Sequence, residues 1–221
     1  MTFNTNQLSN KTTEIKCVLA FIVATLSTVI NAEQVNNYSP LSHYFMDGKM
    51  VGTWKWIVGN KSNHYVPIKG VSGKTIDSKL SVTSAEYKGE NTAIKAIWEG
   101  SVDRSSLYLL RVGTIDLESV KDKVAISAEY LIESKEGDLR MAFFQDCKYP
   151  CRAEMDISKH FQSKALNQWF TFPIPLNCFT KSGLDAKKIV SPFMLSTSSK
   201  LSLRIANVRL ILLPEGEKGC L

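Results

Sequence analysis

The feature that most constrains the fold is the segment from Leu166 to Leu212, in which strand-like stretches alternate with turn signals. Pro173 and Pro175 lack an amide proton, which favours an edge strand in its first part. A last stretch at 201–210 alternates apolar and polar residues. Four apolar side chains share one parity and would lie on one face of a strand: Phe170, Phe172, Ile174 and Leu176. The segment predicts the closing half of a β-sandwich.

The rest of the chain shows further short strand patterns at regular spacing. Val124 to Glu133 alternates most clearly, and residues 134–137 predict a hairpin turn before a return strand at 138–145. Helical patterns are confined to 156–163 and to one turn with Asp185 as its N-cap. Further strands are expected at 52–59, 79–82, 92–98 and 106–111. Because crossover helices are missing, the pattern excludes a parallel α/β fold and predicts an all-β, antiparallel β-sandwich.

The first 32 residues predict a secretory signal peptide rather than part of the fold. A polar leader ends at Lys16 and precedes an apolar run from Cys17 to Ile30, which is too short to span a bilayer comfortably. Small residues before Glu33 offer a cleavage site. An uncleaved anchor is the alternative, because the leader is long and weakly basic. We therefore expect a protein that is exported to the periplasm or the extracellular space.

The sequence that follows the leader has the length of a single domain. We expect an irregular lead-in at 33–51, the β-sandwich at 52–214 and a C-terminal tail at 215–221. The chain has 27 Lys and Arg against 21 Asp and Glu, and these charges are dispersed without a basic run, which argues against nucleic acid as a partner. No apolar segment after residue 33 is long enough to span a membrane. A monomer without membrane contact is expected once the leader is cleaved.

Four cysteines follow the leader, and export permits them to form disulfides in any of three pairings. Cys147 and Cys151 are brought close by a turn that contains proline, so this pair is the first choice. Cys178 with Cys220 would follow. Zinc is the rival reading, but no second close cysteine pair or histidine pair supports it. We expect no metal site at these cysteines.

The sequence offers no catalytic constellation. His43, His64 and His160 lie far apart, and no serine sits in a Gly-x-Ser-x-Gly turn. The acidic residues are scattered, and a paired-carboxylate site would need a cleft that the sequence cannot show. We therefore expect no catalytic residues and a protein that is not an enzyme.

The aromatic residues give a different indication of function. Sandwiches that bind carbohydrate stack sugar rings on exposed aromatic side chains and reach the hydroxyls with a few polar groups. Trp54 and Trp56 share one face, which suits a stacking platform, although a core position competes with that reading. Trp98 and Trp169 are expected to be structural. The candidate carbohydrate-binding residues, which include two loop tyrosines and two polar residues beside the cysteine loop, are Trp54, Trp56, Tyr65, Arg140, Gln145 and Tyr149.

A series of short motifs runs in order through residues 52–210. They are Trp54-x-x-x-Val58-Gly59, Ile97-Trp98-Glu-Gly100, Cys147-x-x-x-Cys151, the run from Trp169 to Phe179, Gly183-Leu-Asp-Ala, Pro192-Phe193 and Leu201-x-Leu-x-Ile-x-x-Val-Arg-Leu210. In this order and spacing the chain resembles the galactose-binding-like C-terminal domain of the ExoP type, found behind the catalytic domains of bacterial family 3 glycoside hydrolases. The resemblance implies a jelly-roll sandwich and a non-catalytic role in attaching an enzyme to a polysaccharide such as a β-glucan.

Three features depart from that family. The catalytic barrel is missing, so the resemblance implies a stand-alone module. Many galactose-binding-like sandwiches carry an acidic residue in the closing strand that helps to hold calcium, and here Ala206 takes that position. Calcium prefers several oxygen ligands, so a structural calcium ion is conceivable but disfavoured, and no cofactor is expected. Cys220 lies beyond the shared region, which makes its pairing specific to this chain.

The leading hypothesis is an exported module that binds a polysaccharide or oligosaccharide and has a glycoside hydrolase as a further candidate partner. The alternative is a protein-interaction module that docks an envelope protein or a separately encoded hydrolase. A small hydrolase with an unrecognised site is the third reading, and no residue can be named for it.

Overall fold

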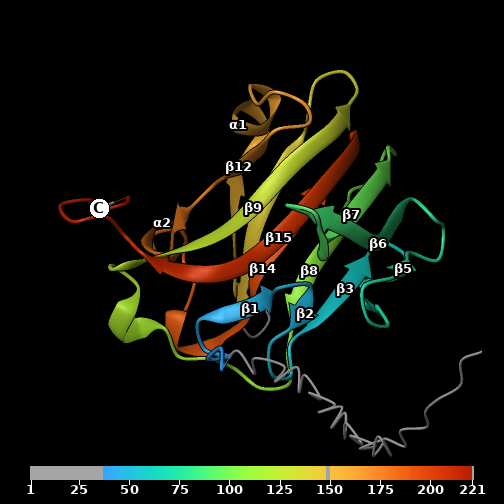
Figure 1. Ribbon diagram of the computed structural model, residues 1–221. Coiled ribbons are helices and arrows are strands. Elements are labelled where there is room, and N and C mark those ends of the chain that lie inside the picture. The colour runs from blue at the N-terminus through green and yellow to red at the C-terminus, as the bar shows by residue number, and fades with distance from the viewer. Residues whose placement is uncertain (1–36, 148–149, 221) are drawn as a thin grey trace, which may run out of the picture. The chain divides into compact units, whose positions relative to one another are not determined.

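The computed structural model describes residues 37–147 and 150–220, which form two antiparallel β-sheets that share one apolar core (Figure 1). The all-β sandwich expected from the sequence is therefore confirmed. The predicted signal peptide at 1–32 lies outside the described residues. Within the described ranges, no helix has the length and apolar character needed to cross a membrane.

The larger sheet contains the longest strand of the protein, β15 (Lys200–Leu212), which is also the last strand in the sequence. Its strands are β1 (His43–Met46), β2 (Lys49–Met50), β5 (Gly73–Lys74), β6 (Leu80–Tyr87), β7 (Glu90–Glu99), β9 (Val124–Lys135), β12 (Trp169–Thr171), β13 (Ile174–Pro175) and β15 (Lys200–Leu212). The main order is β12-β9-β15-β7-β6-β5, and β13 also pairs with β9. The proline-containing segment thus lies at the sheet edge, as predicted. Strand β1 pairs with β15, so the expected irregular lead-in is wrong for these residues.

The smaller sheet has the order β11-β10-β14-β8-β3-β4. Its strands are β3 (Lys55–Gly59), β4 (Val66–Pro67), β8 (Ser105–Leu110), β10 (Met141–Cys147), β11 (Arg152–Asp156) and β14 (Ile189–Thr197). Strands β9 and β10 belong to different sheets, so the predicted hairpin at 134–137 is wrong. Alternation shows that two neighbouring segments are strands, but it does not show that they pair with each other.

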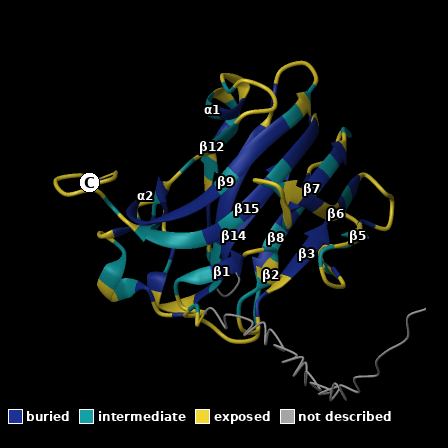
Figure 2. Cartoon of the chain, in the orientation of Figure 1, coloured by how far each residue is buried: buried dark blue, intermediate teal, exposed yellow. Residues whose placement is uncertain are grey.

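The core is filled by the side chains that alternate inward from both sheets. In β9 the inner parity contributes Val124, Ile126 and Tyr130, whereas Glu129 and Glu133 lie on the other face and are only partly buried. Figure 2 shows the strands largely buried and the connecting loops exposed. In β8 the same alternation leaves every second side chain outside the core, and this outward parity positions the groove described below.

Short helical turns close the ends of the sandwich. They are α1 (Ser158–Gln162), α2 (Asn177–Thr180), η1 (Glu118–Val120) and η2 (Ala186–Lys188). The predicted N-cap is confirmed, since the Asp185 side chain accepts a hydrogen bond from the Lys187 amide. A disulfide joins Cys178 in α2 to Cys220 in the C-terminal tail. The Cys147–Cys151 disulfide is present as well, so both predicted pairings are confirmed.

Candidate functional site

A groove of about 660 Å³ lies on the outer face of the smaller sheet. Its lining comes from β8, β10, β11 and β14, from the loop at 59–64, and from residues 103–104 just before β8. These segments are far apart in the sequence, and the strand order brings them side by side. The groove is therefore a product of the sheet topology rather than of any single motif.

The floor of the groove is a row of apolar side chains across three neighbouring strands. Phe144 pairs with Met194, which in turn pairs with Tyr108, so the three side chains lie on one face. They form a small apolar cluster of their own, separate from the main core. In the next row Ser106 donates a hydrogen bond to Ser196 at 2.9 Å, and these short side chains leave room above them.

One wall of the groove is the loop that follows β3. The Asn60 side chain accepts hydrogen bonds from the amides of Ser62 and Asn63, which folds the loop back on itself. The Tyr108 hydroxyl then donates a hydrogen bond of 2.5 Å to the carbonyl of His64. Burial raises the pKa of Tyr108 to about 12, so this hydroxyl stays protonated and keeps the wall against the floor at neutral pH.

The opposite wall carries the charged groups of the hairpin formed by β10 and β11. Arg152 forms a fork with Asp146, from Nε to Oδ1 at 2.5 Å and from Nη2 to Oδ2 at 2.8 Å. The Arg152 guanidinium also lies over the Phe144 ring, 5.4 Å from its centroid. Arg104 reaches from the start of β8 to Glu154 on β11, with 2.7 Å between Nη1 and Oε1. The two arginines therefore tie the hairpin to the floor and to the far side of the groove.

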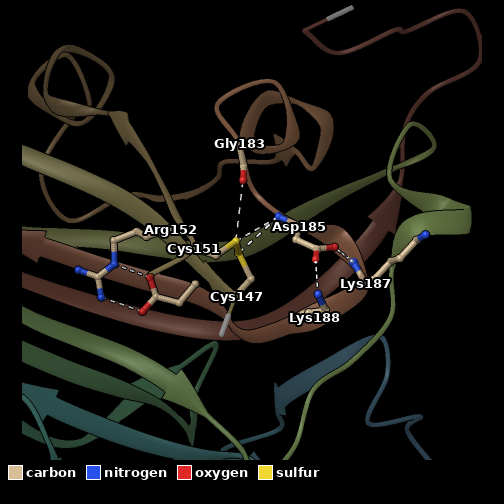
Figure 3. Close-up of a disulfide and its surroundings, with 8 residues drawn as sticks. Cys147, Cys151, Arg152, Gly183, Asp185, Lys187 and Lys188 are labelled. Atoms are coloured by element: carbon tan, nitrogen blue, oxygen red, sulfur yellow. Dashed lines mark hydrogen bonds and ion pairs between the residues drawn. A yellow bond between two sulfur atoms is a disulfide. The ribbon is translucent and has the colours of Figure 1, made fainter. Parts of the chain in front are cut away.

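The Cys147–Cys151 disulfide closes the end of the same hairpin, directly beside the ion pair. Cys147 follows Asp146 and Cys151 precedes Arg152, with 5.1 Å between the two cysteine Cα atoms. Figure 3 shows the disulfide with the Arg152 fork on one side and the amide of Asp185 on the other. That amide donates to Cys151 Sγ at 3.3 Å, so the bridge holds the base of the ion pair against the turn before η2.

The predicted tryptophan platform is not part of this groove. Trp54 and Trp56 are 2% and 1% exposed, respectively. Trp54 packs edge-on against Tyr44 and donates its Nε1 hydrogen to the Pro40 carbonyl, while Trp56 packs against Phe193. The burial corrects the stacking prediction, because the parity that the two residues share points into the core.

The other candidate residues are spread over the molecule. Gln145 is fully buried, and its amide nitrogen donates to the Pro192 carbonyl, so it is no ligand contact either. Arg140 is exposed but does not line the groove, and Tyr149 lies outside the described residues. Tyr65 is 52% exposed and follows His64 at the rim, so among the predicted residues that the structure describes it is the one that lies beside the groove.

The groove residues that sequence reasoning missed are Tyr108, Phe144, Asp146, Arg152 and Glu154. Two signals point to them. Strand β8 alternates buried and half-buried residues, with Tyr108 on the outward parity. Asp146 and Arg152 are the immediate neighbours of Cys147 and Cys151, whose spacing predicts a disulfide. A disulfide that closes a hairpin places its two flanking side chains opposite each other, as the pairing of these residues shows.

Ala206 is the closing-strand position at which the sequence disfavours calcium, because it lacks an acidic side chain. Ala206 is fully buried on the outer face of the larger sheet, in a cluster with Ala85 and Ala93 that Tyr87 and Trp169 cover. Among the residues that the structure describes, no group of three or more His, Cys, Asp or Glu side chains is arranged to hold a metal ion. The carboxylates in the groove are each paired with a basic side chain, an arrangement that suits hydrogen bonding to a ligand.

The comparisons with known proteins agree with this architecture. The extra C-terminal domain of the exo-1,3/1,4-beta-glucanase ExoP from a Pseudoalteromonas species is 20% identical, with a TM-score of 0.63, over 80% of this chain and 95% of that one. The complete glucanase matches with 22% identity and a TM-score of 0.61, over 83% of this chain but only 22% of the enzyme. The family 30 carbohydrate-binding module of a Clostridium thermocellum cellulosomal cellulase is 16% identical, with a TM-score of 0.54, over 79% of this chain and 98% of that one.

A comparison with curated proteins finds no match. The family model described as galactose-binding domain-like, Exop_C, matches residues 53–210, which include all of the strands that line the groove. The resemblance inferred from the sequence motifs is thereby confirmed, and the chain belongs to the Exop_C family of galactose-binding domain-like domains.

Proposed function

We propose that this protein is a non-catalytic carbohydrate-binding module and that the groove on the smaller sheet holds the sugar. The observation that carries the proposal is the groove itself, in which an apolar floor is flanked by converging hydrogen-bonding side chains. Small-molecule sites have this composition, a mostly apolar surface with a few placed polar groups. The likeness of the fold to modules that bind carbohydrate supports the same reading.

A β-glucan type of polysaccharide is the ligand that we propose to test first. The ExoP domain belongs to an enzyme named for 1,3- and 1,4-linked β-glucans, and that domain shares the fold of this chain. A module of this kind would deliver an attached or separately encoded glycoside hydrolase to its polysaccharide. The two disulfides fit an exported protein, because such bridges persist in oxidising compartments.

The proposal is tested by native affinity electrophoresis in gels that contain laminarin, barley β-glucan or xyloglucan. Ser106→Tyr places a bulky side chain on the groove floor, and we expect it to abolish retardation. Thr83→Tyr is the matched control, since Thr83 is an exposed strand residue of the other sheet. Retardation that survives Ser106→Tyr would move the binding site elsewhere. A wild-type protein that no polysaccharide retards would overturn the proposal and favour docking to a protein.

A further inference from the structure

The charges that line the groove are balanced and paired. The described lining residues include three basic and three acidic side chains, histidine apart. Each basic side chain lies within 4 Å of a carboxylate, in the pairs Arg152–Asp146, Arg104–Glu154 and Lys61–Asp103. The chain as a whole has a formal charge of +6, so this balance is a property of the groove and not of the protein. An anionic ligand would find no unpaired cation among these groups.

The aromatic surface of the groove is small. The chain has four tryptophans, of which three are buried in the core and Trp169 lies on the other sheet. Phe144 is only 7% exposed, and the Arg152 guanidinium lies over its ring. Sugar rings held chiefly by stacking need open aromatic faces. Tyr108 on the floor and Tyr65 at the rim are the described aromatic rings that remain for stacking, so hydrogen bonds must contribute beside them.

The Arg152–Asp146 fork is suited to adjacent hydroxyl groups. A hydroxyl both donates and accepts a hydrogen bond, whereas a carboxylate only accepts and a guanidinium only donates. The fork uses two of the five N–H groups of Arg152, so others remain to donate to a ligand oxygen. Asp146 can at the same time accept from the neighbouring hydroxyl, since each carboxylate oxygen has further acceptor capacity. Both bonds would be charge-assisted and thus stronger than neutral ones.

Arg152 is held ready for this contact before any ligand arrives. Asp146 fixes its Nε edge, the Phe144 ring supports its flat face, and the adjacent disulfide closes the hairpin behind both residues. Side chains that are already ordered lose little conformational entropy on binding. A carboxylate-bearing sugar would have to approach Asp146 and Glu154 and compete with them for their arginines, which costs free energy.

Building on the proposed function, we infer that the groove selects an uncharged sugar chain. Asp146 and Arg152 bind two adjacent hydroxyl groups of that chain by hydrogen bonds. This assigns the ligand class and the two residues that determine specificity. Neutral glucans, mannans and xyloglucans belong to the class, whereas uronic-acid and sulfated polysaccharides do not.

The test compares neutral and anionic polysaccharides in affinity gels of rising salt concentration. We expect retardation by laminarin or barley β-glucan that persists at 0.5 M NaCl. Any retardation by alginate or polygalacturonate should vanish there, because scattered surface lysines give only screened attraction. Salt-resistant retardation by alginate would overturn the inference and leave carbohydrate binding standing.

The residue assignment is tested with Asp146→Asn on the full chain, measured against the neutral polysaccharide that is bound. Loss of one charge-assisted contact and of the Arg152 fork should weaken binding roughly 10-fold to 100-fold. Glu136→Gln is the matched control, since Glu136 pairs with Lys200 at an exposed site outside the groove. Thermal unfolding of both variants verifies that they are folded. Unchanged affinity in folded Asp146→Asn would sink the assignment, whereas a wild type that binds no glycan would sink the proposed function with it.

Discussion

Tyr87 and Trp169 meet edge to face, with 4.7 Å between their ring centroids and an angle of 89° between the rings. Tyr87 ends β6 and Trp169 begins β12, so three strands of the larger sheet separate them in the strand order. The two rings cover the alanine cluster of Ala85, Ala93 and Ala206 on the outer face of that sheet. This aromatic contact closes a small second core on the side of the molecule opposite to the groove.

We predict that Trp169→Ala destabilises the fold without affecting the groove. The partly buried ring loses its contact with Tyr87 and uncovers the alanines, which should lower the free energy of unfolding by roughly 1–2 kcal/mol. Urea denaturation measures the change. Ile76→Ala serves as the control, because Ile76 is 75% exposed and should unfold like the wild type. An unchanged denaturation midpoint for Trp169→Ala would show that the contact adds no stability.

A second prediction concerns Ala206, the closing-strand position at which the family resemblance leads us to expect an acidic residue. Ala206→Asp would bury a carboxylate beneath Tyr87 and Trp169 and place it opposite Glu129 on the neighbouring strand. We expect a loss of roughly 3 kcal/mol or more, since an unpaired buried charge is strongly destabilising. Denaturation is measured with and without millimolar calcium. Full recovery of stability in calcium would mean that the site can still be built, contrary to the packing seen here.

The fold could be predicted from the sequence because its signals are local. The alternation in Val124–Lys135 reports which side chains enter the core, and the closing strand does the same. The spacing of Cys147 and Cys151 also limits the pairing to a tight turn. What the local pattern lacks is the identity of the partner strand, which is why β9 and β10 were expected to form a hairpin and instead lie in different sheets.

The site could not be predicted because both faces of its strands carry apolar residues. In Met141–Cys147, Phe143 and Phe144 are adjacent aromatics, yet Phe143 packs in the core and Phe144 lies on the groove floor. The same ambiguity placed Trp56 in a binding site when it belongs to the core. Sequence chemistry shows which residues can stack on a sugar. The choice between core and groove is made by pairing across strands that are far apart in the chain.

The acid stability of the larger sheet should depend on Glu133. Burial alone would raise the pKa of Glu133, but hydrogen bonds from Lys95, Ser202 and Arg204 outweigh it and lower the pKa to about 2. A lowered folded-state pKa gives stability that is present above the unfolded value of 4.5 and is lost as the pH falls towards 2. Glu133→Gln should therefore cost roughly 2–3 kcal/mol at pH 7 and flatten the loss of stability between pH 4.5 and 2.

Denaturation curves at pH 7, 4 and 2.5 measure this dependence. Glu136→Gln is the control, because its ion pair with Lys200 is exposed and should contribute little. Equal acid sensitivity in Glu133→Gln and the wild type would show that other carboxylates control acid unfolding.

Gly59 should be required for the wall of the groove. A Cβ atom at this position would lie 2.8 Å from the carbonyl carbon of His64, so the loop would have to move away from the strand. That movement breaks the bond between the Tyr108 hydroxyl and the His64 carbonyl. We expect Gly59→Ala to weaken glycan binding about 10-fold and to lower stability by about 1–2 kcal/mol. Gly89→Ala tests the specificity of the effect, since Gly89 has nothing within 4 Å and should affect stability alone through its positive φ.

The two disulfides should act on different properties of the protein. The Cys178–Cys220 bridge spans 42 residues and the Cys147–Cys151 bridge spans 4, so chain entropy predicts losses of about 4 and about 2 kcal/mol when each pair is replaced by alanine. Glycan binding should follow the opposite order, because only the short bridge lies next to Asp146 and Arg152. Urea denaturation and affinity electrophoresis of the two double variants measure both effects. If loss of the long bridge weakened binding more than loss of the short one, the Arg152–Asp146 ion pair would not depend on the closed hairpin. Contact with the Phe144 ring would then have to keep the Arg152 side chain in place.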